Sequence, residues 1–83
     1  MPLANITDWQ TNLSTALDEY STDQNPIKIS QLCHRLGLNL QGATDEERIN
    51  SLRLITRAQE TIREASDIAY RKISDLITNI QNP

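Results

Sequence analysis

Residues 43–82 contain neither glycine nor proline, and this uninterrupted stretch most constrains what the chain can fold into. Gly and Pro are the residues that interrupt helices most strongly. Strand-like alternation of apolar and polar residues is limited to the short segment 27–29. The sequence therefore predicts an all-α fold. We expect a single domain over 1–83, a small helical bundle of two short helices and one long C-terminal helix.

The length of the chain limits the size of its hydrophobic core. Eighty-three residues are enough for one domain, and a domain of this size buries less than about two-thirds of its unfolded surface. The sequence has no Phe, one Trp and two Tyr, so the core is expected to consist mainly of Ile and Leu. The predicted core residues are Leu13, Leu17, Ile29, Leu32, Leu36, Ile55 and Ile62.

The first predicted helix spans residues 7–21. Thr7 and Gln10 have the three-residue spacing of a capping box at a helix start. Apolar residues recur at steps of three and four, which is the period of one helix face. This face consists of Ile6, Trp9, Leu13, Ala16, Leu17 and Tyr20. The polar segment 21–25 is expected to end the helix.

The second predicted helix spans residues 26–36. Asn25 is a favourable N-cap, and Pro26 is favoured at the first helical position. Gly37 is typical of the residue that follows a helix C-terminus. These three residues predict both ends of the helix.

The third predicted helix spans residues 45–80, after a connector whose Leu38 and Leu40 are expected to turn back into the core. Thr44 and the acidic residues 45–47 have the pattern of a capping box. Acidic side chains are favourable there because a helix N-terminus carries partial positive charge. At 1.5 Å per residue, this helix would be roughly 54 Å long.

The first two helices would be roughly 22 and 17 Å long, too short to cover the third if they fold back on it as a hairpin. An apolar stripe would then remain exposed, and such stripes usually mark interfaces. The predicted interface residues are Ile62, Ala65, Ala69, Ile73, Leu76, Ile77 and Ile80. The stripe would pair in a homodimer or accept a helix of another protein. In the alternative arrangement, the first two helices lie end to end along the third and hide the stripe.

No group of residues in the sequence points to catalysis or to a bound cofactor. Cys33 and His34 are neighbours, but consecutive helical residues diverge by about 100° and do not face each other. Cys33 shares a face with apolar residues, so we expect it to be buried and unreactive. One Cys and one His cannot supply the ligands of a structural zinc site. We therefore expect no enzyme activity, no catalytic residues, no metal and no cofactor.

Segment 29–38 resembles the first helix and turn of a helix-turn-helix motif. Cys33 stands at the small-residue position and Gly37 at the turn glycine. The resemblance implies an alternative function, a DNA-associated regulator with a degenerate motif around residues 29–48. The next helix departs from the motif, because residues 45–47 would point carboxylates at the major groove. The net charge of −3 also disfavours binding to nucleic acid.

The function that these observations favour is a non-enzymatic protein–protein interaction module that uses the long amphipathic C-terminal helix. Such modules include small helical adaptors, chaperone-like subunits, antitoxins and assembly proteins. The partner would be a second copy of the chain or another protein. The sequence has no run of about 18 apolar residues for a membrane span. Its first residues lack the basic and apolar stretches of a secretory signal, so a cytoplasmic location is expected.

Overall fold

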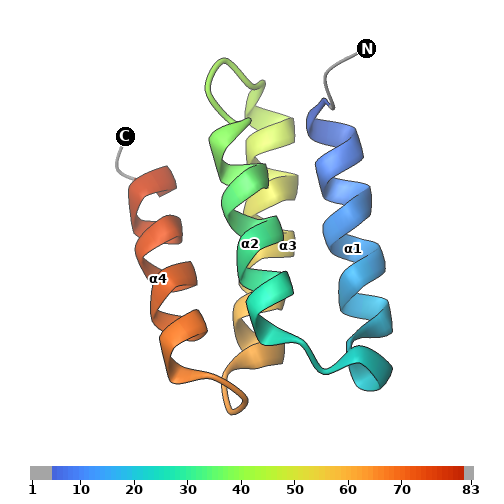
Figure 1. Ribbon diagram of the computed structural model, residues 1–83. Coiled ribbons are helices and arrows are strands. Elements are labelled where there is room, and N and C mark those ends of the chain that lie inside the picture. The colour runs from blue at the N-terminus through green and yellow to red at the C-terminus, as the bar shows by residue number, and fades with distance from the viewer. Residues whose placement is uncertain (1–4, 82–83) are drawn as a thin grey trace.

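The computed structural model describes residues 5–81, which form four α-helices (Figure 1). Helix α1 spans Ile6–Asp23, α2 Pro26–Leu38, α3 Asp45–Ile62 and α4 Asp67–Gln81. The all-α prediction is confirmed for the described residues, none of which lies in a strand. The expectation about a secretory signal falls mainly on residues 1–4, which lie outside the described part, as do residues 82–83. Among the four helices, none combines the length and the hydropathy that a membrane crossing requires.

Reciprocal side-chain caps start α1 and α3. The Asn5 side chain accepts the Asp8 N–H at 2.9 Å, and the Asp8 carboxylate accepts the Asn5 N–H at 3.3 Å. The predicted capping box of Thr7 and Gln10 is therefore wrong, because the true pair lies two residues earlier. At α3, Thr44 Oγ1 accepts the Glu47 N–H at 3.1 Å, and Glu47 Oε1 accepts the Thr44 N–H at 2.9 Å. That predicted helix start is confirmed.

Helix α2 begins as predicted but ends later than expected. The Asn25 side chain accepts the Lys28 N–H at 3.1 Å, and Pro26 occupies the first helical position. The helix then continues through Gly37 to Leu38, with Asn39 as its C-cap. The prediction that Gly37 terminates the helix is wrong, because the left-handed backbone conformation lies later in the connector, at Gly42 (φ 81°).

The prediction of a single helix over 45–80 is wrong, because residues 63–66 interrupt it. The Ile62 carbonyl accepts the N–H groups of Ala65 and Ser66 at 3.0 and 3.2 Å, which closes a turn. The Ser66 hydroxyl then accepts the Ala69 N–H at 3.2 Å and acts as an N-cap for α4. A serine cap therefore restarts the helix in a new direction without Gly or Pro.

The interruption is favourable because it allows α4 to fold back and bury its apolar face. Ala69, Ile73 and Ile80 are 1%, 0% and 9% exposed, respectively. Burying one isoleucine side chain stabilises the fold by about 1.5–3 kcal/mol. Each main-chain hydrogen bond lost at the turn costs only about 0.5–1.5 kcal/mol net, and the serine cap recovers about 1 kcal/mol. The burial therefore outweighs the cost of the turn.

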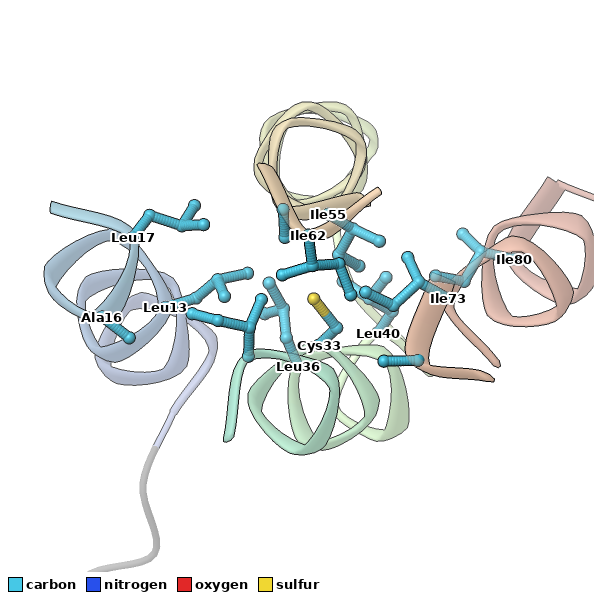
Figure 2. Packing of buried hydrophobic residues seen from close by; sticks show 13 residues of the cluster. Leu13, Ala16, Leu17, Cys33, Leu36, Leu40, Ile55, Ile62, Ile73 and Ile80 are labelled. Carbon is cyan, nitrogen blue, oxygen red and sulfur yellow. The ribbon is translucent and has the colours of Figure 1, made fainter. Parts of the chain in front are cut away.

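The four helices form a flat bundle with α2 and α3 in its middle. These two helices run antiparallel side by side, and α1 and α4 pack on opposite flanks of the pair without contacting each other (Figures 1 and 2). The described chain measures 32 × 30 × 20 Å. The shortest dimension fits two layers of helices, since packed helix axes lie about 8–10 Å apart. Both arrangements considered from the sequence are replaced, because the third predicted helix is itself folded.

The core fills the space between α2 and α3 and extends to both flanking helices, with Cys33 near its centre (Figure 2). Six of the seven predicted core residues are confirmed as buried, and Leu32 is half-buried against them. The confirmed residues are Leu13, Leu17, Ile29, Leu36, Ile55 and Ile62. Within the described residues, every buried side-chain N or O atom has a hydrogen-bond partner.

Substitution of Ile73 tests whether α4 folds back onto the bundle. Because Ile73 is fully buried, we expect Ile73→Ala to lower the free energy of unfolding by about 2–5 kcal/mol. Ile68 lies on the same helix but is 67% exposed, so Ile68→Ala should change the free energy of unfolding by less than about 0.5 kcal/mol. Urea denaturation followed by circular dichroism measures both values. Equal effects of the two substitutions would contradict the observed packing of α4.

Candidate interaction surface

The seven residues predicted as a partner interface lie in different environments. Ile62, Ala69, Ile73 and Ile80 are buried in the core of the chain itself. Leu76 and Ile77 are half-buried against that core, and Ala65 is exposed in the turn before α4. The premise of a free apolar stripe is therefore corrected: α2 and α3 of the same chain cover most of it.

A different surface is hollowed where α2 packs beside α4. Two hollows of about 630 and 680 Å³ lie next to each other and share His34 and Leu38 in their linings, and we name the pair the α2–α4 groove. Helix α2, the connector after it, one residue of α3 and the outer edge of α4 contribute to its lining. The lining residues are Ser30, Gln31, His34, Arg35, Gly37, Leu38, Leu40, Gln41, Gly42, Arg48, Lys72, Leu76, Asn79 and Ile80.

The apolar part of the groove depends on a close approach between Gly37 and Leu76. A Cβ atom on Gly37 would lie 2.6 Å from Leu76 Cδ1, closer than carbon atoms can approach without displacement. Leu40 is buried beside them, as predicted, whereas Leu38 is 80% exposed at the rim. The prediction that Leu38 turns into the core is therefore wrong. Its exposed side chain instead extends the apolar surface that the two hollows share.

The two sides of the groove are helix edges of equal length. Along α2 the lining runs from Ser30 to Leu38, and along α4 it runs from Lys72 to Ile80. Each edge advances eight residues between these positions, which corresponds to about 12 Å at 1.5 Å per residue. The groove is therefore long enough for about two turns of a bound helix.

The groove carries positive charge in a protein of net charge −3. Arg35, Arg48 and Lys72 contribute to its lining, and no Asp or Glu does. Within the described residues, these three cations form no ion pair with a carboxylate. Four of the other basic residues do, in the pairs Lys28–Asp23, Arg57–Asp18, Arg63–Glu60 and Arg71–Asp67. The charge of the groove is therefore not neutralised by salt bridges.

Two contacts hold the α2 side of the groove in place. The Arg35 guanidinium lies over the Trp9 ring of α1, 5.6 Å from the ring centroid, which is within range of a cation–π interaction. His34 Nδ1 lies 2.9 Å from the Ser30 carbonyl oxygen and donates to it, because a carbonyl oxygen can only accept. Both side chains are thereby oriented on the outer face of α2.

The structure gives Cys33 and His34 no joint chemistry. Cys33 is fully buried, and desolvation by this burial raises the pKa of its thiol from 9.0 to about 12. A buried thiol that keeps its proton is a poor nucleophile. Within the described residues, no three His, Cys, Asp or Glu side chains gather in a way that could hold a metal ion.

The segment that resembles a helix-turn-helix has a different geometry in the fold. Helices α2 and α3 lie side by side in opposite directions (Figure 1), whereas the helices of that motif cross at about 90–120°. The first turn of α3 carries Asp45, Glu46 and Glu47. Such a turn repels phosphates rather than attracting them.

Sequence reasoning missed the residues that give the groove its character. Lys72, Leu76 and Asn79 recur at four- and three-residue steps along one edge of α4, which is a detectable pattern. Leu38 and Arg48, however, join them only because α4 folds back beside α2.

No protein-family model matches the chain, and no match was found among curated proteins or solved structures.

The two glycines offer a test of the close approach at the groove floor. We expect Gly37→Ala to shift the Leu76 methyl signals in NMR spectra, because the new Cβ displaces that side chain. The unfolding free energy should change by less than about 1 kcal/mol, since the gain in helix propensity offsets the displacement. In contrast, Gly42→Ala should cost about 1 kcal/mol through its left-handed backbone and leave the Leu76 signals unchanged. Unmoved Leu76 methyl signals in Gly37→Ala would refute the contact.

The raised pKa of Cys33 predicts how stability depends on alkaline pH. Between pH 9.0 and about 12, the unfolded chain releases the thiol proton while the folded chain retains it. The folded state then binds more protons, so stability falls as pH rises, by up to about 1.4 kcal/mol per pH unit. We therefore expect the unfolding free energy to fall more steeply above pH 9.0 in the native chain than in Cys33→Ala. Parallel slopes in denaturant titrations would contradict a buried thiol.

Proposed function

We propose that this chain is a non-enzymatic protein–protein interaction module that binds its partner in the α2–α4 groove. The observation that carries the proposal is Leu38, the most exposed of the large apolar side chains in the described residues, at the junction of two hollows. A single exposed leucine is common on protein surfaces. Here it stands beside the half-buried Leu76, over a floor where Leu40 and Ile80 are buried, as anchor residues do at interfaces.

The residues that line the groove support binding rather than catalysis. Its volume lies in the range of ligand-binding clefts, but its lining contains no acidic residue and no thiol that could act as a base or nucleophile. General acid–base catalysis needs titratable groups held at a substrate, and the His34 ring is oriented instead by its hydrogen bond to the Ser30 carbonyl of the same helix. This composition fits a surface that binds an apolar, charged protein segment better than it fits an active site.

The acidic start of α3 weighs against the alternative of a DNA-associated regulator. The carboxylates of Asp45 and Glu46 are exposed there, and Glu47 caps the helix. The positive charges of the groove flank an apolar depression and do not form the extended basic face that phosphate contacts require. We therefore retain the interaction module as the proposal.

Site-directed photo-crosslinking tests the proposed function in cells of the native host. A photoreactive amino acid at Leu38 should give a defined crosslinked product, because this side chain projects from the rim of the groove. The same amino acid at Ile68, which is exposed outside the groove, serves as the control and should not give that product. Mass spectrometry of the product identifies the partner as another protein or a second copy of this chain.

Binding of the purified partner then provides the quantitative test. Leu38→Asp should weaken the affinity by about tenfold or more, because it places a charge at an apolar anchor. Ile68→Asp makes the same chemical change outside the groove and should leave the affinity within about twofold of the native value. Identical crosslinks at both positions, or equal affinities of both variants, would overturn the assignment of the groove.

A further inference from the structure

We infer that the occupant of the α2–α4 groove is a short amphipathic helix of another protein that is acidic and carries aliphatic anchors. This inference rests on the proposed function and adds the chemistry of the partner. Its basis is the combination of unpaired basic side chains, an apolar floor and a limited length in the groove. The basic side chains restrict the charge of the bound segment, the apolar floor restricts its anchor side chains, and the length restricts the number of its helical turns.

The charge of the groove requires a negative partner. Arg35, Arg48 and Lys72 are three of the four basic residues that form no ion pair within the described part of the chain. The fourth, Arg53, does not line the groove. Guanidinium and ammonium groups in this position favour carboxylates on the facing surface. A basic partner would instead meet the like charges of Arg48 and Lys72, and such repulsion excludes wrong partners.

The neighbouring acidic residues of the chain do not supply these carboxylates. Glu47 precedes Arg48, but its carboxylate accepts the Thr44 N–H at 2.9 Å as part of the α3 cap. Asp75 precedes Leu76, yet it does not contribute to the lining and forms no ion pair with Lys72. Arg48 and Lys72 therefore remain available to carboxylates of an incoming segment, whereas the Arg35 guanidinium lies over the Trp9 ring of α1.

The apolar floor and the length of the groove require a short segment with aliphatic side chains. Leu38 and Leu76 border the apolar part of the groove, and the two hollows together extend over about 12 Å, which matches two turns of a helix. An amphipathic helix presents side chains at steps of three and four along one face, and this is how helices bind in hydrophobic grooves. Glutamate residues beside that face would reach the cations at the rim.

Within residues 5–81, the chain has no unpaired helix face to offer to this groove. Each of the four helices buries one apolar face in the common core. The exposed aliphatic residues outside the groove, Ile27, Ile49 and Ile68, lie on three different helices. They do not form the continuous stripe that a two-turn anchor needs, so a different protein fits the groove better than a second copy of this chain.

Titration of the full-length isotope-labelled chain with synthetic peptides tests the inference. The probe is a peptide of about 12 residues, held helical by a covalent side-chain staple because a free peptide of this length and charge is not helical, with Leu at steps of three and four and Glu at the other positions. Two matched peptides replace every Glu by Lys or every Leu by Ser. We expect the Leu/Glu peptide to shift the backbone NMR signals of the groove and to bind about tenfold more tightly than either control peptide. Raising NaCl from about 50 to about 500 mM should weaken this binding several-fold.

Matched protein variants locate the contact on the groove. Arg48 and Arg53 lie on the same helix and neither forms an ion pair, but only Arg48 lines the groove. Arg48→Gln should therefore weaken binding of the Leu/Glu peptide by about threefold, whereas Arg53→Gln should not change it. Leu38→Ser should weaken binding by about tenfold, and Ile68→Ser should not. Circular dichroism spectra establish that all four variants are folded.

The outcomes separate this inference from the proposed function. Equal binding of the Leu/Glu and Leu/Lys peptides in the groove would overturn the acidic partner while leaving the groove as an interaction site. Absence of any peptide-induced shift, together with a specific crosslink at Leu38, would likewise refute the inference alone. Groove signals that move with the concentration of the free protein would show that a second copy occupies it, and this also contradicts the inference. If no peptide binds in the groove and no specific crosslink forms at Leu38, both proposals are refuted.

Discussion

The packing of α4 against α2 and α3 is the interaction on which the rest of the structure depends. Without it, Ile73 and Ile80 would stand in water and the core would be open on one flank. The same packing places Leu76 directly against Gly37, which has no side chain to prevent the approach. The inner face of α4 thus closes the core, while its outer edge forms one side of the groove.

The central pair of helices explains how so thin a domain holds together. Helices α1 and α4 do not contact each other, so each depends on its own contacts with α2 and α3. Polar contacts supplement the apolar ones on both flanks. Gln10 of α1 donates to the buried Ser51 hydroxyl of α3 at 2.9 Å, and Gln59 of α3 donates to the Ser74 hydroxyl of α4. These bonds favour one alignment of each flanking helix, because a shift along α3 would leave a buried hydroxyl without its partner.

The sequence predicts the apolar stripe of the C-terminal half as a partner interface, but the chain's own helices cover most of it. An uninterrupted helix over 45–80 would need a second molecule to bury Ile73. The turn at 63–66 removes this requirement by returning α4 to its own chain. The surface left for a partner is accordingly smaller and of mixed character, with Leu38 beside the cations Arg48 and Lys72.

The sequence by itself determined the helical class, the caps at Asn25 and Thr44, and most of the core, because caps and apolar periodicity are local properties of neighbouring residues. It also determined that Cys33 is buried, from the apolar face that it shares. Only the tertiary structure decided the turn at 63–66, since residues compatible with a helix were bent there by the burial of side chains many positions away. The groove was decided in the same way, because its two edges are distant in sequence and meet only after α4 folds back. Local preferences place helices, whereas competition for a limited amount of buried surface decides where they turn and which faces remain exposed.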